Sequence, residues 1–173
     1  MGTTWEPDCP VGLTDLRYLT VTFWGFDRRP HTGELIVQAD HDRGMVDVFR
    51  TLYAARLPIE QMTLPTSARP DPTPSGDGNG AGAFVCRSPT GQTFWSAHVS
   101  GLALDLNPFQ NPYSRDDLVL PDLAGSYLDR GWRRPGMITA DGVVKRAFAW
   151  IGWSWGGGFQ SLKDYQHFSA AGR

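Results

Sequence analysis

His98 and Asp105 lie in the stretch SAHVSGLALDLNP, and His167 follows Asp164 by three residues in DYQHF. The chain has only 4 histidines, so few pairs of imidazoles are available for a metal site. Catalytic zinc takes three protein ligands, which are imidazole nitrogens or carboxylate oxygens, and keeps a fourth position for water. The metal lowers the pKa of that water, and a separate carboxylate accepts its proton. The residue types fit a hydrolytic zinc site with the ligands His98, Asp105 and His167, although the spacing alone is also that of histidines with a purely structural role. Asp164 is then the general base.

A bend at Gly101 explains how His98 and Asp105 can reach one point. The run LALDL (102–106) alternates as a strand does, and Gly101 interrupts the helical spacing before it. A residue before the turn and a residue on the following strand can therefore converge. Residues 153–155 and 166–169 also predict strands, with the glycine loop GGGF between them.

The other expected strands lie in the first half of the chain. Residues 16–24 and 31–38 are apolar, β-branched runs on either side of a turn, which predicts a β-hairpin. Shorter strands are expected over 59–64 and 83–87.

Two helices are expected from the spacing of apolar residues. The first begins near Asp40 or Asp42, either of which can cap it. Its apolar face consists of Met45, Val48, Phe49, Leu52 and Tyr53. The second helix is expected over 141–152, with Asp141 as its cap and Gly152 as its stop.

The remaining segments contain turn residues rather than periodic patterns. Residues 65–82 are rich in Pro and Gly and predict a long flexible loop, and residues 107–136 are turn-rich. Hairpins, meandering strands and two helices favour an α+β fold, a small and mostly antiparallel sheet flanked by helices. We expect residues 1–173 to form a single domain, since the length suits one core.

Composition and charge argue against several classes of partner. The formal net charge is -2 and the pI is about 6.0, so no basic face for nucleic acid is expected. No segment approaches the roughly 20 apolar residues that span a bilayer. The N-terminus MGTTWEPDCP lacks the basic and apolar regions of a signal peptide. We therefore expect no nucleic-acid partner and no membrane span, and nothing demands more than a monomer.

Two cysteines, Cys9 and Cys86, are too far apart in sequence for a zinc knuckle. They are either two buried thiols or one disulfide that ties the N-terminal arm to the segment before His98. A disulfide would indicate an oxidising compartment.

The motifs around these residues resemble those of a known peptidase family. SAHVSGLALD fits the form Ser-x-His-x-x-Gly-x-Ala-x-Asp, and the second motif comprises Trp155-Gly156-Gly157 followed by Asp164-x-x-His167-Phe168. Both resemble the M15 family of zinc D-Ala-D-Ala carboxypeptidases and L-alanyl-D-glutamate endopeptidases. That family is related to the lysostaphin-type peptidases and the hedgehog signalling domain. GFDRRPHTGELIV and FRTLYAARLPIEQM in the front half resemble the endopeptidase branch.

The resemblance implies a hedgehog/D,D-peptidase-like fold that binds Zn²⁺ through the two histidines and Asp105, with Asp164 as the base. It also implies that Arg87 faces the substrate carbonyl or the developing oxyanion, where a fixed cation stabilises negative charge. A structural salt bridge is the alternative for Arg87. Ser96 either supports the zinc ligands or caps the turn that holds His98. Trp155 either lines the substrate groove or packs in the core.

One departure from the family pattern concerns the substrate. Family members often have His-Ala-Tyr-Gly where this chain has His98-Val99-Ser100-Gly101, so an aromatic ring is missing. All the ligand positions are kept.

The predicted activity is zinc-dependent hydrolysis of an amide bond in peptidoglycan stem peptides, with the L-Ala-D-Glu endopeptidase preferred. A D-Ala-D-Ala carboxypeptidase is one alternative. A non-catalytic, zinc-stabilised module that binds the cell wall or a peptide is the other. The expected location is extracellular or at the cell wall, reached after trimming of a leader or by another export route.

Overall fold

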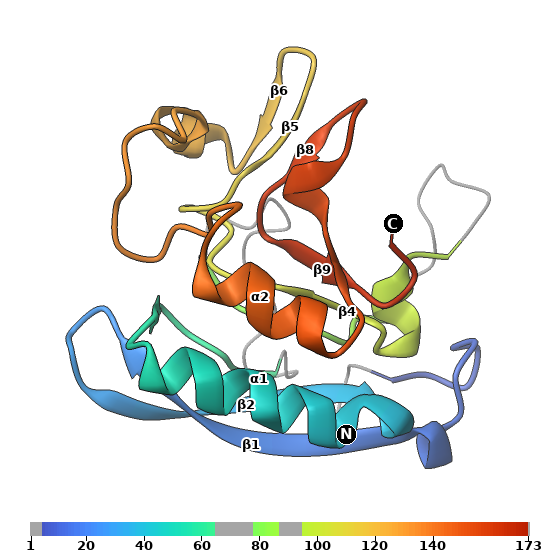
Figure 1. Ribbon diagram of the computed structural model, residues 1–173. Helices are drawn as coiled ribbons and strands as arrows, with labels where there is room; N and C mark the ends of the chain where they lie inside the picture. The colour runs from blue at the N-terminus through green and yellow to red at the C-terminus, as the bar shows by residue number, and fades with distance from the viewer. Residues whose placement is uncertain (1–4, 65–77, 87–94, 173) are drawn as a thin grey trace.

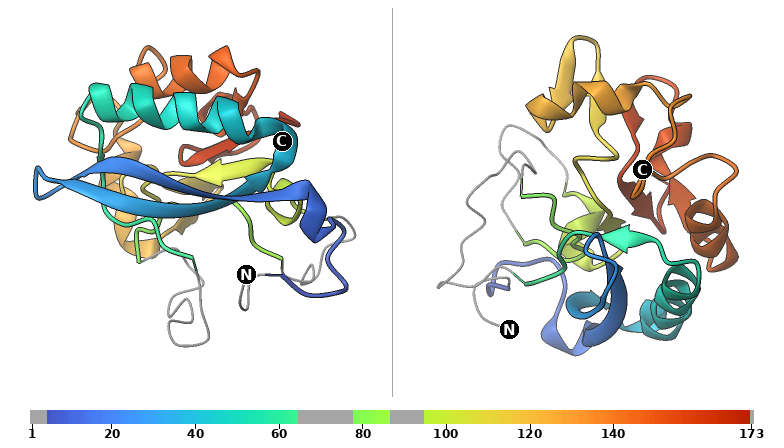
Figure 2. Two further views of the ribbon diagram at one scale, coloured as in Figure 1. Left: turned by 90° about the horizontal axis from the view of Figure 1, so that it is seen from below. Right: turned by 90° about the vertical axis from the view of Figure 1, so that its left-hand side faces the viewer.

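A computed structural model of the chain describes residues 5–64, 78–86 and 95–172. Two α-helices, α1 (Asp42–Ala54) and α2 (Val143–Trp150), lie side by side, and α1 packs over a long β-hairpin (Figures 1 and 2). Three small, mostly antiparallel sheets complete the structure, so the predicted α+β class is confirmed. Short 3₁₀-helices occur at Leu13–Asp15, Ala39–His41, Ala97–Ser100, Asp122–Leu128 and Gly156–Gly158.

The predicted hairpin forms the first sheet. Strand β1 (Leu16–Gly25) pairs antiparallel with β2 (Pro30–Gln38) along its length. Strand β3 (Pro58–Ile59) lies parallel to the end of β1. The strand expected over 59–64 is therefore shorter than predicted, although Gln61 makes an isolated bridge with Gly80.

The helices bury the predicted apolar faces, but their predicted caps are wrong. In α1 the buried residues are Met45, Val48, Phe49 and Leu52, whereas Tyr53 is exposed and packs against the edge of Trp24. The α1 cap is His41, which makes no side-chain cap bond. The α2 cap is Gly142, because the Asp141 carboxylate is held by Arg133 at 2.9 Å instead. Gly152 has a φ of 81° and follows the end of α2 as predicted.

Two further sheets carry the C-terminal half. The second has the order β4 (Ala103–Asp105), β9 (His167–Ser169), β7 (Ser154–Trp155), which confirms the three strands predicted around the chemical motifs. The third has the order β6 (Leu118–Leu120), β5 (Tyr113–Arg115), β8 (Lys163–Asp164). The β5–β6 hairpin lies in the segment that predicts only turns, because strands of three residues show no usable periodicity.

The segment before the first motif differs from its prediction. Residues 83–86 form no strand, and Gly82 instead makes an antiparallel bridge with Asp105. Most of the predicted loop over 65–82, and Arg87, lie outside the described residues. Cys9 and Cys86 form a disulfide, which resolves the two alternatives for these cysteines.

One hydrophobic core joins the two halves of the chain. It includes Phe23 and Leu35 of the hairpin, Phe49 of α1, Phe148 of α2 and Phe168 of β9. The Phe148 and Phe168 rings stack with centroids 3.9 Å apart. Each such buried side chain contributes roughly 1.5–3 kcal/mol, so β9 and its His167 are held firmly. No helix among the described residues is long and apolar enough to cross a membrane.

Candidate metal centre

Asp105 and His167 meet because β4 and β9 pair antiparallel. The two residues are direct partners in the strand register, so their side chains lie on the same face of the sheet. His167 Nδ1 lies 3.0 Å from Asp105 Oδ1. Two predicted ligands, which are 62 positions apart in the sequence, are therefore neighbours.

His98 reaches the same point from the 3₁₀-helix Ala97–Ser100. The Ser96 hydroxyl accepts a hydrogen bond from His98 N at 3.3 Å, so Ser96 caps this turn. Gly101 ends the turn with a φ of 67°. A Cβ atom at Gly101 would lie 2.6 Å from Gln38 N of the hairpin, so only glycine fits there. The turn is thus fixed between its cap and the hairpin.

The hydrogen bonds of His98 determine which nitrogen faces the centre. Nδ1 lies 2.6 Å from the carbonyl oxygen of Ala83, and because a carbonyl only accepts, Nδ1 carries the proton. Nε2 then faces Asp105 Oδ2 at 3.4 Å. Ligand histidines commonly use one nitrogen in this way to fix the ring and the other for the metal.

The three side chains fit a zinc ion in chemistry and spacing. Each of His98, Asp105 and His167 offers one ligand atom, and these atoms lie within 4.8 Å of one another. Two imidazole nitrogens and one carboxylate oxygen form a typical ligand set of catalytic zinc. The side chains are 17%, 30% and 9% exposed, respectively, so the centre is partly buried but open to a substrate.

The electrostatics of the three residues favour a positive charge at their centre. Burial opposes the charge on Asp105, but the adjacent His98 and His167 hold its pKa well below the usual range. Burial also opposes protonation of His98, yet the Asp105 carboxylate raises the pKa of His98 to about 9. At neutral pH the metal-free centre therefore holds a proton on His98, where a cation would bind.

This raised pKa predicts that zinc and protons compete for the centre. His98 must lose its proton to bind zinc, so the apparent affinity should rise about tenfold per pH unit up to about pH 9. Calorimetry in buffers of different ionisation enthalpy should show one proton released per zinc bound at pH 7. Exposed His31 gives the control, because His31→Gln should release the same number. Zinc binding without proton release would contradict this protonation state.

Asp164 lies near enough to the three ligands to interact electrostatically with each of them. It belongs to β8, where it pairs with Tyr113 of β5. Burial, and then repulsion from Asp105, raise the pKa of Asp164 to about 6. Its Oδ1 is buried and has no hydrogen-bond partner among the described residues. Burying such an oxygen costs free energy unless a water or a substrate donates a hydrogen bond to it. A general base, which accepts a proton from water, has this requirement.

The backbone around Asp164 is held by residues that the spacing argument missed. A Cβ atom at Gly156 would lie 2.6 Å from the Asp164 carbonyl oxygen and 2.9 Å from its Cβ. Trp155 is partly buried against the core and donates from Nε1 to the carbonyl oxygen of Tyr165 at 2.8 Å. Trp155 therefore packs in the core and positions the chain next to Asp164. The glycine pair after Trp155 is the sequence signal for this close approach.

We expect Gly156→Ala to impair catalysis by displacing Asp164. A shift of about 1 Å in a catalytic group costs on the order of a hundredfold in rate, and zinc binding should be kept. Gly158→Ala is the matched control, since a Cβ there would meet nothing within 4 Å. Steady-state rates and zinc content of both variants test this, and equal rates would contradict the role of Gly156.

The comparisons with known proteins agree with this site. Residues 90–170 match a family model described as D-alanyl-D-alanine carboxypeptidase, of peptidase family M15. Neither the search of curated proteins nor that of solved structures gives a match. The matched segment contains His98, Asp105, Asp164 and His167. Residues 90–170 are thus similar to the peptidases of family M15, and the group His98, Asp105 and His167 within them could hold a metal ion.

Proposed function

We propose that this protein hydrolyses an amide bond in peptidoglycan stem peptides, with L-Ala-D-Glu as the preferred bond. The observation that carries the proposal is the group His98, Asp105 and His167, together with nearby Asp164, whose buried Oδ1 has no hydrogen-bond partner among the described residues. The front half of the chain, which resembles the endopeptidase branch, supports the choice of bond. Action on wall peptides would place the protein at the cell wall or outside the cell, and the Cys9–Cys86 disulfide supports an oxidising compartment.

The residues of the chain would divide the chemistry among them. His98 Nε2, His167 Nδ1 and the Asp105 carboxylate would hold the zinc ion. Zinc supplies the Lewis acidity that polarises the scissile carbonyl and makes water a nucleophile at neutral pH.

Asp164 would take a proton from the attacking water at Oδ1 and return it to the leaving amine. In the metal-free centre the pKa of Asp164 is about 6, so its carboxylate is mostly ionised at pH 7 and can accept a proton. We also propose that Arg87, which directly follows Cys86, stabilises the developing oxyanion.

We further propose that residues 1–173 form one peptidase domain. The larger hydrophobic core, which joins the hairpin to β9, supports this, since neither half keeps that buried apolar surface alone.

A D-Ala-D-Ala carboxypeptidase is the second candidate, because the matched family model carries that description. Zinc-loaded protein incubated with a soluble muramyl pentapeptide would distinguish the two activities by product mass. Loss of the peptide beyond L-Ala would establish the endopeptidase, and loss of only the terminal alanine would establish the carboxypeptidase. An unchanged substrate, with zinc bound, would favour a non-catalytic binding module instead.

A further inference from the structure

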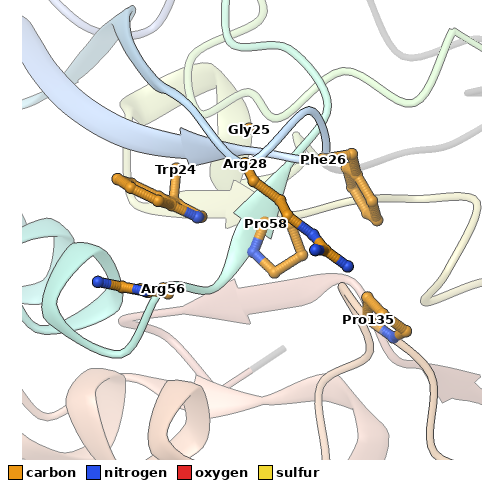
Figure 3. A pocket seen from close by; sticks show the side chains of 7 residues that line it. All are labelled: Trp24, Gly25, Phe26, Arg28, Arg56, Pro58 and Pro135. Carbon is orange, nitrogen blue, oxygen red and sulfur yellow. The ribbon is translucent and has the colours of Figure 1, made fainter.

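A cavity of about 460 Å³ lies at the end of the hairpin, and none of the metal ligands lines it. Three separate parts of the chain supply its side chains: Trp24, Phe26, Arg28, Arg56, Pro58 and Pro135 (Figure 3). The lining is thus four flat apolar side chains and two guanidinium groups, without an acidic residue.

Both arginines have left-handed backbone conformations, with φ of 61° at Arg28 and 53° at Arg56. Among the described residues the other non-glycine residues with positive φ are Asn79, Asn107 and Asp116. Asn and Asp tolerate this conformation because their short side chains bond locally, whereas a long side chain such as arginine is unfavourable there. The two residues that break this preference line the same cavity.

Arg56 stands where a helix end normally has glycine. Arg56 N donates to Tyr53 O at 2.9 Å, and Leu57 N donates to Leu52 O at 3.1 Å. These two bonds after α1 form a Schellman motif, with Arg56 at its left-handed position. Glycine would satisfy the same bonds with less strain.

Arg28 occupies the equivalent position in the hairpin loop. Gly25 N donates to Arg29 O at 2.8 Å, so the loop consists of Phe26, Asp27 and Arg28. Three-residue hairpin loops place their last residue in the left-handed region, where glycine is again the usual choice. Backbone strain at two such positions points to a role for the side chains rather than for the fold.

The two guanidinium groups are available to a ligand. Neither makes an ion pair with any described residue, and the Arg56 guanidinium lies 5.2 Å from the centroid of the Trp24 ring. The nearby carboxylate of Asp27 is held by His31 at 2.9 Å. In Figure 3 the two guanidinium groups lie on opposite sides of the Pro58 ring. They therefore suit an extended anionic ligand with apolar or ring-shaped parts, rather than one small anion.

The cavity wall is hydrogen-bonded to the segment that follows β4, the strand with the metal ligand Asp105. Asn107, two residues after Asp105, donates from Nδ2 to the carbonyl oxygen of Pro58 at 2.8 Å and to that of Gly136 at 3.2 Å. Pro58 lines the cavity, and Gly136 directly follows Pro135. These bonds link two parts of the cavity wall to the chain just after Asp105.

We propose that this cavity is a second subsite, which binds a carboxylate-bearing part of the peptidoglycan substrate away from the scissile bond. The inference rests on the proposed function for the identity of the ligand. Stem peptides that contain D-Glu and a terminal carboxylate supply the anionic groups that the two arginines would pair with. The aromatic rings and prolines would pack against the uncharged parts.

The test compares zinc-loaded Arg28→Gly/Arg56→Gly with Arg43→Gln/Arg50→Gln, which removes two exposed arginine charges from α1 outside the cavity. For a muramyl pentapeptide, the first variant should raise KM by about tenfold with kcat little changed. The control should leave both unchanged. The thermal midpoint of the first variant should equal or exceed that of the wild type, since glycine relieves strain. Amidating the carboxylates of the pentapeptide should abolish the difference in KM between the wild type and Arg28→Gly/Arg56→Gly.

An unchanged KM would overturn the subsite, and a lowered thermal midpoint would show that the arginines serve the fold. A separate titration measures the Kd of the pentapeptide from intrinsic fluorescence. If the wild type does not hydrolyse the pentapeptide either, the proposed activity is wrong, and the measured Kd still tests the subsite. A Kd that depends on the two arginines would support it, and a Kd that does not would refute it.

Discussion

Asp164→Asn should keep zinc and lose turnover. The asparagine side chain has nearly the same size as aspartate but could not accept a proton, and general-base catalysis contributes on the order of 10²–10⁴-fold in rate. Asp164 is not one of the three residues whose ligand atoms meet within 4.8 Å, so the metal content should stay at one zinc per chain. Zinc analysis and kcat measured on the same sample test this prediction.

The exposed Asp47 on α1 supplies the matched control, and Asp47→Asn should leave kcat unchanged. Full activity in Asp164→Asn would show that the base is assigned to the wrong residue. Loss of activity with zinc retained would also argue against a pure binding module, because such a module needs no base.

His167→Ala should lose both zinc and turnover. The substitution removes one of three ligands and leaves the partly buried Asp105 carboxylate with His98 as its remaining partner. We expect the zinc affinity to fall by more than about a hundredfold, since even the loss of residues that only orient ligands costs ten- to a hundredfold. Equilibrium dialysis against a zinc chelator of known affinity measures the change.

His31→Ala is the matched control for His167→Ala, because His31 is exposed and pairs with Asp27 rather than with the metal centre. It should keep zinc and activity. If His167→Ala bound zinc as tightly as the wild type, the metal would be held elsewhere and the centre described above would be wrong.

The three residues that the sequence motifs single out as ligands lie together in the structure, and two of them lie on strands that the sequence predicts. The alternation around Asp105 and the motif around His167 both mark short buried strands, and the structure pairs these residues directly. The residue spacing did not reveal the partners that hold the site in place. Ala83 contributes its backbone carbonyl oxygen, which leaves no signal in the sequence, whereas Gly156 contributes the absence of a side chain, and its only signal is the glycine pair after Trp155.

The departures from the predicted fold lie at positions where the local sequence pattern does not determine the structure. Asp141 has the side chain of a helix cap but pairs with Arg133. Residues 83–86 have strand composition, yet the bridge to Asp105 forms at Gly82. Arg28 and Arg56 occupy positions where local rules predict glycine. That last disagreement between local preference and structure led to the proposed subsite.

The most direct test of the account is a zinc titration of the metal-free protein with a soluble muropeptide as substrate. Release of a new amine should be absent at the start and rise in proportion to added zinc. It should reach a plateau at one equivalent per chain, in the wild type but not in His167→Ala. Hydrolysis without metal, or none with one zinc bound, would contradict a zinc peptidase built on His98, Asp105 and His167.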